Sequence, residues 1–280
     1  MFINQQTLID SITFSGIGLH TGKSVKVKIF PEKVNSGINF IFGKEKIKAS
    51  WKNAQISQLC TKIKKKNFYI STIEHLMSAL SATGVTNASI QTTSEEIPIL
   101  DGSAKDFVEK ILNIGVVNQK VPQKIIQINK KVSYSINDKY IEITPNKKKL
   151  TIDYSIDYKD DFIKKQSLYY EHNLDNFKDI YLARTFCLHR DLEKIFAMGL
   201  AKGGTLDNAI VVSGKKILNQ GGLRYKDEFV RHKILDCIGD LYLAEYQIVG
   251  NIKTFGGGHE INLMLLYEIF KDNSNFEILG

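Results

Sequence analysis

The chain has 280 residues, a mass of 31.7 kDa and 43% hydrophobic residues, enough for one large domain or two of ordinary size. Its formal net charge is +8, but only 4 of its 38 basic residues are Arg, so Lys is the general surface cation. Lys runs such as 64–66 and 147–149 are typical of solvated loops, and we expect no nucleic-acid partner. A nucleic-acid-binding protein remains the alternative from another functional class.

Targeting and redox signals are absent from the sequence pattern. No run of 18 apolar residues predicts a transmembrane helix, and the first residues lack the basic and apolar regions of a signal peptide. We therefore expect a cytoplasmic protein with at most transient contact with a membrane surface. The cysteines are odd in number and form no CxxC pair, so reduced thiols are expected.

The first half predicts short strands and two helices. Alternating apolar residues predict strands at 24–30, 37–42 and 88–92. Helices are predicted at 72–82 and 104–113. The polar, Pro-containing stretch 117–124 is typical of a linker.

The second half repeats this theme. The predicted strands are 139–143, 150–156, 209–212 and 248–253. The predicted helices are 192–199, 228–244 and one that begins after Gly258.

The helix at 228–244 carries the strongest chemical signal. At about 100° per residue, His232, Lys233, Asp236 and Asp240 share one arc. The opposite side is apolar and can face a core; it holds Ile234, Leu235, Ile238, Leu241 and Tyr242. Because side chains at i and i+4 are neighbours, His232 and Asp236 can hold one metal ion.

A second polar cluster opens the helix at 72–82. Ser71-x-x-Glu74 fits a capping box, and Thr72 is an alternative cap, so Glu74 can have a purely structural role. His75 alone would be typical of a structural histidine. Together with His232 and Asp236, however, His75 completes the two-His, one-carboxylate set of an open zinc site. Glu74 is then placed to be the base that activates water.

His259 follows three consecutive glycines. Alone it is typical of a loop histidine. Beside a metal-bound amide it can stabilise an oxyanion and protonate the leaving amine, with Asp240 as the partner that orients its ring.

Two glycine-rich segments have simpler interpretations. Residues 16–24 contain Gly-Lys-Ser, but Ile17 stands where a P-loop needs Gly, and a strand follows where a helix is needed. They predict a turn between strands. Residues 201–205 predict a flexible turn that either borders a ligand channel or is a plain connector.

These motifs lie in the order found in a known family. The matching segments are 16–22, 71–76, 96–103, 183–186, 203–204, 229–241 and 258–259. The chain resembles the UDP-3-O-acyl-N-acetylglucosamine deacetylases, the zinc amidases of lipid A biosynthesis in Gram-negative bacteria. Cys187 departs from the family pattern, in which a small residue is expected.

The resemblance implies an α+β fold with two similar domains, each a small β-sheet packed against two helices. The domains would span 1–120 and 125–280. A small inserted sheet would lie at about 41–66 in the first. A βαβ insert at about 190–214 in the second would form a hydrophobic passage for an acyl chain.

The resemblance also implies residue roles. One Zn²⁺ per chain, with Fe²⁺ as a possible substitute, would be held by His75, His232 and Asp236. Glu74 would be the general base, and His259, supported by Asp240, the acid or oxyanion partner. Thr185 would hydrogen-bond the oxyanion, and Lys233 would support substrate binding or transition-state charge. The further substrate-binding residues would be His20, Phe186 and Gly203.

The implied reaction is hydrolysis of the 2-acetamido group of UDP-3-O-acyl-N-acetylglucosamine, which releases acetate and UDP-3-O-acyl-glucosamine in the committed step of lipid A biosynthesis. No obligate protein partner is predicted. A zinc hydrolase of the same fold that acts on another N-acetylated sugar remains an alternative.

Overall fold

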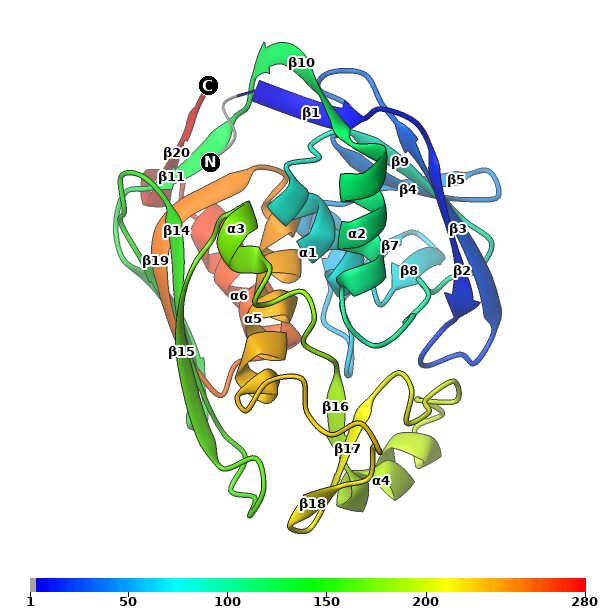
Figure 1. Ribbon diagram of the computed structural model, residues 1–280. Coiled ribbons are helices and arrows are strands. Elements are labelled where there is room, and N and C mark those ends of the chain that lie inside the picture. The colour runs from blue at the N-terminus through cyan, green and yellow to red at the C-terminus, as the bar shows by residue number, and fades with distance from the viewer. Residues whose placement is uncertain (1–3) are drawn as a thin grey trace.

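The computed structural model describes residues 4–280, with a layer of helices between two β-sheets (Figure 1). The central layer contains α1 (Glu74–Thr83), α2 (Lys105–Ile114), α5 (Glu228–Leu241) and α6 (His259–Phe270). Helix α1 packs against α2 and α5, and α5 packs against α6. This arrangement confirms the predicted α+β class, in which each half of the chain contributes a sheet and two helices.

The first-half sheet has the strand order β2-β3-β9-β4-β5. Its strands are β2 (Ile12–Ile17), β3 (Ser24–Pro31), β4 (Ile38–Phe42), β5 (Glu45–Lys48) and β9 (Ala88–Thr92). Alternate side chains such as Val27, Ile29 and Ile90 are fully buried against the helices. The glycine-rich segment 16–24 forms the turn between β2 and β3, as predicted.

The second-half sheet has seven strands, with β19 (Gln247–Phe255) at its centre. Strand β19 pairs with β11 and β14 in parallel and with β13 antiparallel. The other strands are β11 (Ile125–Ile128), β12 (Val132–Ile136), β13 (Lys139–Thr144), β14 (Leu150–Asp157), β15 (Lys165–Glu171) and β20 (Phe276–Leu279).

The predicted linker at 117–124 is wrong for most of its length. Residues Val116–Pro122 form β10, which pairs antiparallel with β1 (Asn4–Leu8). Several β10 side chains are exposed, because this ribbon has only two strands. That exposure explains why its composition is polar. The predicted boundary near 120–125 therefore follows a strand, and the domain limits stay a prediction.

The two inserts flank the helical layer. A three-stranded sheet is formed by β6 (Ala54–Gln55), β7 (Lys62–Lys65) and β8 (Phe68–Ser71). It begins later than the predicted 41–66, because β5 belongs to the main sheet. In the second half, β16 (Phe186–Leu188), α4 (Leu192–Ala197) and β17 (Ile210–Ser213) make a parallel βαβ unit.

The remaining elements are short. They are α3 (Leu174–Phe177), β18 (Lys216–Ile217) and 3-10 turns at Trp51–Asn53, His189–Asp191, Tyr242–Ala244 and Asn273–Asn275. The predicted helix at 228–244 therefore ends as a 3-10 turn after Leu241. Within residues 4–280 no helix combines the length and the apolar character that a membrane crossing needs.

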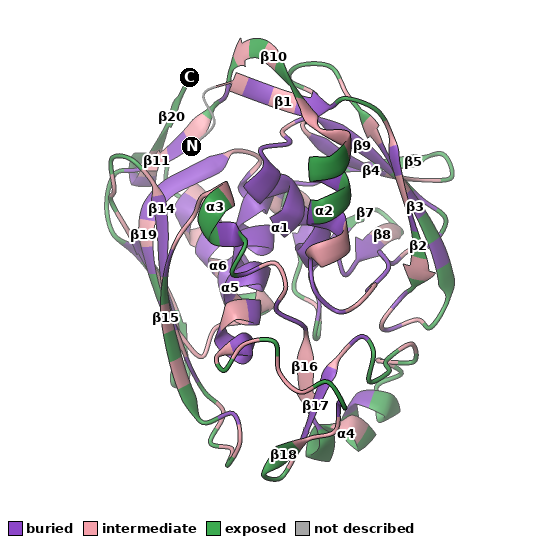
Figure 2. Cartoon of the chain, in the orientation of Figure 1, coloured by how far each residue is buried: buried purple, intermediate pink, exposed green. Residues whose placement is uncertain are grey.

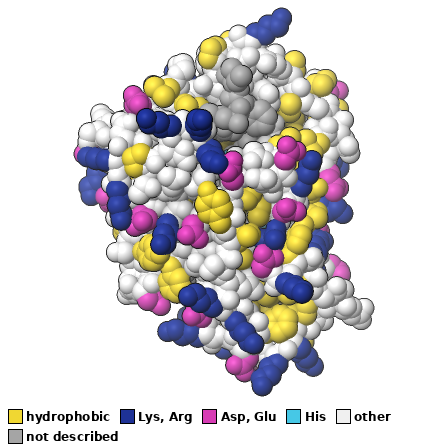
Figure 3. Space-filling model, turned by 60° about the vertical axis from the view of Figure 1, so that its left-hand side comes forward, with side chains coloured by type: hydrophobic (Ala, Val, Ile, Leu, Met, Phe, Trp, Pro, Cys, Tyr) yellow, Lys and Arg dark blue, Asp and Glu magenta, His cyan; other side chains and the backbone are white. Residues whose placement is uncertain are grey.

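Burial is concentrated in the central helices. Helices α1, α5 and α6 are mostly buried, whereas α4 and the outer strands are largely exposed (Figure 2). On the polar face of α5, His232, Asp236 and Asp240 are therefore buried, as are the residues of its apolar face. On the face shown in Figure 3, Lys and Arg are spread among Asp and Glu and form no single basic stripe.

Candidate active site and metal centre

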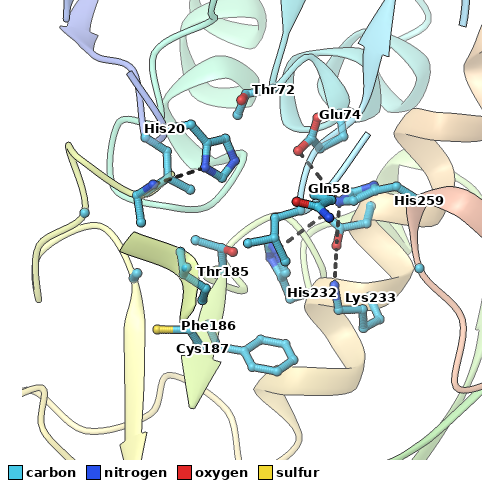
Figure 4. Close-up of a pocket in the computed structure, with 18 of the residues that line it drawn as sticks. His20, Gln58, Thr72, Glu74, Thr185, Phe186, Cys187, His232, Lys233 and His259 are labelled. Carbon is cyan, nitrogen blue, oxygen red and sulfur yellow. Dashed lines mark hydrogen bonds and ion pairs between the residues drawn. The ribbon is translucent and has the colours of Figure 1, made fainter. Parts of the chain in front are cut away.

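A cavity of about 980 Å³ is lined by residues from both halves of the chain and from both inserts. One set of lining residues is polar and comes from α1, α5 and the start of α6 (Figure 4). Another set is apolar and comes from the βαβ insert and the residues around it: Leu192, Ile195, Phe196, Leu206, Val211 and Leu218. The cavity thus joins a polar centre to an apolar wall.

Three predicted metal ligands meet in the polar part. One ligand atom each from His75, His232 and Asp236 lies within 4.8 Å of the other two, and all three residues are buried. Asp236 Oδ1 lies 3.4 Å from His232 Nε2 and 3.6 Å from His75 Nε2. Ligands of a tetrahedral zinc ion are separated by about 3.4 Å, given bonds of about 2.0–2.1 Å. The spacing therefore fits one such ion.

Asp236 Oδ1 supplies an independent test of that fit. It is buried and has no hydrogen-bond partner, although its other oxygen accepts from Lys233 Nζ at 2.9 Å. A buried carboxylate oxygen without a donor is costly unless a cation satisfies it. The residues present thus suit a divalent metal ion.

Close packing of α1 on α5 brings the candidate ligands together. A Cβ at Gly239 of α5 would overlap the backbone carbonyl of Glu74 at the start of α1. Only glycine permits this approach. Gly239 lies between Asp236 and Asp240 in the sequence, so this close approach of the two helices falls at the site.

His232 is held in the neutral tautomer that a metal ion would require. Its Nδ1 lies 3.0 Å from the carbonyl oxygen of Ala183, so Nδ1–H donates and Nε2 is left for the ion. Burial lowers the pKa of His232 to about 3, which keeps the ring neutral. The Ala183 segment is anchored by the buried pair of Arg184 Nε and Glu228 Oε1 at 2.9 Å.

Lys233 supplies a fixed positive charge. Burial alone would lower the pKa of Lys233, but the Asp236 carboxylate raises it, so the ammonium group stays charged. Its Nζ also lies 5.5 Å from the centre of the Phe186 ring. Lys233 and Phe186 both line the cavity.

Glu74 and His259 lie close to each other beside the candidate metal cluster. Glu74 Oε1 lies 3.8 Å from His259 Nε2, and Glu74 Oε2 accepts from the Thr61 N–H at 3.0 Å. Burial raises the pKa of Glu74. Neither Ser71 nor Thr72 caps α1, whose N-cap is Ile73 without a side-chain bond. The capping box, the alternative interpretation of Glu74, is therefore wrong, and Glu74 lines the cavity instead.

His259 is paired with a carboxylate on its other side. Its Nδ1 donates to Asp240 Oδ2 at 2.9 Å, which leaves Nε2 toward the cavity. Burial alone would lower the pKa of His259, but the carboxylates of Asp240, Asp236 and Glu74 raise it to about 9. The surrounding carboxylates therefore favour the cationic form of the ring.

The remaining predicted residues lie around this centre. Thr185 and Cys187 line the cavity together with Phe186. His20 also lines it, and its buried Nε2 has no partner. Gly203 packs against the turn at Leu19, to whose carbonyl it donates at 2.9 Å, while Gly204 lines the cavity. A substrate contact of Gly203 stays a prediction.

Two buried residues of the site escaped sequence reasoning. Thr61 lies between β6 and β7 in a stretch with no periodic signal. Glu96 binds the backbone N–H groups of His20 and Thr21 at 2.8 Å each and the Thr72 hydroxyl at 3.0 Å. Its only sequence signal was its place in a family-like segment.

Comparison with known proteins agrees with this geometry. Residues 5–271 match the family model "LpxC: UDP-3-O-acyl N-acetylglycosamine deacetylase". The chain belongs to the LpxC family. Members of this family are named as deacetylases, so the protein is a hydrolase that acts on an amide bond.

Curated relatives of the LpxC family cover nearly all of the chain. A UDP-3-O-acyl-N-acetylglucosamine deacetylase from Campylobacter jejuni is 39% identical over 99% of this chain and 95% of its own length. A protein of the same name from Wigglesworthia glossinidia brevipalpis is 41% identical over 98% and 95%. Another from Actinobacillus pleuropneumoniae is 38% identical over 99% and 93%.

Proposed function

We propose that this LpxC-family protein hydrolyses the 2-acetamido group of UDP-3-O-acyl-N-acetylglucosamine, with one zinc ion held by His75, His232 and Asp236. The substrate is the one named for the relatives. The observation that carries the proposal is the meeting of the three-ligand cluster with Glu74 and His259 in one cavity. Cytoplasmic action in lipid A biosynthesis belongs to the same proposal.

A zinc ion at this site would polarise the acetamido carbonyl and lower the pKa of bound water. Two imidazoles and one carboxylate also suit Fe²⁺, so iron is an admissible substitute.

Glu74 acts as the general base. The Thr61 N–H occupies Glu74 Oε2, which leaves Oε1 as the oxygen that faces His259 and the cavity. A raised pKa increases the proton affinity of this carboxylate, which suits a base that removes a proton from the attacking water.

His259 supplies positive charge and a proton. Its Nδ1 is occupied by Asp240, so Nε2–H is the group that can donate toward the reacting amide. The cationic ring stabilises the oxyanion and then protonates the leaving amine. Thr185, on the cavity wall, completes the oxyanion contacts, and the Lys233 ammonium adds positive charge beside the centre.

The apolar wall suits the 3-O-acyl chain. Phe196 and Leu206 line the cavity and yet are 55% and 46% exposed. An acyl chain would cover this surface and gain about 25 cal/mol per Å² of buried apolar area. Exposed apolar side chains at the mouth are also consistent with transient contact with a membrane surface.

The proposal is tested by measuring acetate release from UDP-3-O-acyl-N-acetylglucosamine and from the analogue that lacks the acyl chain. We expect release by the intact protein and a large loss of turnover without the acyl group. Glu74→Gln and His259→Gln should each lower turnover by about 10²–10³-fold with the metal retained. Near-full turnover in both variants, with metal bound, would contradict the mechanism. Equal turnover of the analogue would favour another N-acetylated sugar as the substrate.

A further inference from the structure

Thr61 contacts both halves of the proposed acid–base machinery. Its backbone N–H donates to Glu74 Oε2 at 3.0 Å, and its hydroxyl donates to Asp240 Oδ1. The same hydroxyl oxygen lies 3.1 Å from His259 Nδ1. No part of Thr61 is exposed to solvent. One residue of the first insert therefore contacts side chains from α1, α5 and α6.

The bonds to Asp240 fix the orientation of its carboxylate. Oδ1 accepts from the Thr61 hydroxyl, while Oδ2 accepts from His259 Nδ1 at 2.9 Å and from Asn262 Nδ2 at 2.8 Å. A carboxylate with a donor on each oxygen cannot rotate without breaking a buried bond. The Thr61 hydroxyl thus keeps Oδ2 aimed at the His259 ring.

The bond from the Thr61 N–H fixes the orientation of the Glu74 carboxylate in the same way. The Thr61 N–H occupies one carboxylate oxygen, and the free oxygen, Oε1, is the one that lies 3.8 Å from His259 Nε2. In both acids Thr61 binds the oxygen that the chemistry does not use. The reacting oxygen of Glu74 and the ring of His259 are then held in a fixed relation.

We infer that Thr61 is a positioning residue, which sets the relative geometry of Glu74 and the Asp240–His259 pair without contacting the substrate. This inference rests on the proposed function. It also gives the β6-β7-β8 insert a role in catalysis, because Thr61 immediately precedes β7. Misplacement of catalytic groups by about 1 Å can cost 10²-fold in rate.

The test compares Thr61→Val, Thr61→Ser and the unchanged protein in acetate release. Thr61→Val keeps the shape and the backbone N–H but removes the hydroxyl. We expect kcat to fall about 10- to 100-fold with KM and metal content unchanged, as for other partners that orient site residues. Thr61→Ser restores the hydroxyl, and its kcat should return to within about threefold of the original.

Thr83→Val is the matched control. Thr83 is also buried, and its hydroxyl bonds the Ala79 carbonyl at 2.7 Å within α1, at the end away from the site. Loss of the Thr83 hydroxyl should leave kcat unchanged. Equal kcat in Thr61→Val and the unchanged protein would overturn the inference, as would equal losses in Thr61→Val and Thr61→Ser. Absence of acetate release by the unchanged, metal-loaded protein would instead refute the proposed function.

Discussion

Helices α1 and α5 both supply residues of the candidate metal cluster, but they place them by different means. In α5, His232 and Asp236 are one turn apart in the middle of an unbroken helix, and Asp240 follows one turn later. In α1, Glu74 and His75 are the first two residues. Their positions depend on how the chain enters the helix. Local periodicity thus sets one half of the site, and long-range contacts set the other.

The entry to α1 shows this dependence. Thr72 has φ of 56°, which is unfavourable for a β-branched residue. The Thr72 hydroxyl donates to the buried Glu96 at 3.0 Å, and Ser71 bonds the backbone on both sides of Glu96. Glu96 also binds the turn at His20. A strained backbone is therefore stabilised by residues more than 20 positions away.

Loss of a metal ligand from α5 should have the largest effect. His232→Ala should lower turnover by roughly 10³-fold or more, because the proposed ion would supply several kcal/mol of transition-state stabilisation. The helix should still form, since its periodic pattern is intact. Metal analysis and circular dichroism of the purified variant check both expectations. Full metal content with full turnover would show that His232 is no ligand.

Gly239→Ala tests the contact between the two helices. The added methyl group would overlap the Glu74 carbonyl, so stability should fall by about 1–3 kcal/mol. Turnover should fall as well, because Glu74 must move. Gly221→Ala is the control, since a Cβ there meets no atom within 4 Å. Denaturant unfolding measures the stability of both variants. Equal stabilities of Gly239→Ala and Gly221→Ala would mean that α1 can shift without a cost in free energy.

Glu96→Gln tests the entry to α1. Both Glu96 oxygens accept from backbone N–H groups, so an amide NH₂ would face a donor, and stability should fall by about 2 kcal/mol. The partly exposed Glu95→Gln should have little effect, because its contact with Lys23 is a 3.9 Å surface pair. Unchanged unfolding midpoints in Glu96→Gln would contradict the assigned role of Glu96.

The smallest effect is expected at the far end of α1. His172 Nε2 lies 3.2 Å from Ser81 Oγ of α1, and burial lowers the pKa of His172 to about 4. In the unfolded chain the pKa is about 6.5, so the unfolded state binds the proton first as pH falls. The stability that depends on neutral His172 is therefore complete above pH 6.5 and is lost as the pH falls toward 4. At pH 5 the loss in the free energy of unfolding is on the order of 1 kcal/mol for a half-buried ring. His172→Asn should remove this part of the pH dependence in unfolding measured at pH 5 and 7, and an unchanged slope would exclude His172 as its source.

The sequence predicted what periodicity and spacing encode. The polar arc of α5 and the four central helices follow from patterns within a few residues, and the ligand set follows from residue type. The pairing of β10 with β1 could not be read locally, because an exposed two-stranded ribbon has the composition of a linker. Thr61 was missed because no pattern in the neighbouring sequence indicates that it contacts Glu74 and Asp240.

The capping-box alternative for Glu74 failed for the same reason. Ser71 and Glu74 have the correct spacing, but Glu74 Oε2 instead accepts from the Thr61 N–H, across 13 positions of the chain. A tertiary contact overrode a local preference. Such conflicts between local pattern and structure concentrate at the site, where side chains are held for chemistry.

The most direct test of the account is acetate release from UDP-3-O-acyl-N-acetylglucosamine by the protein as isolated, after chelation and after zinc is restored. We expect release, its loss on chelation and its return with zinc. Undiminished release by the folded, metal-free protein would contradict a metal centre built by α1 and α5. Absence of release by the folded, zinc-loaded protein would contradict the proposed substrate.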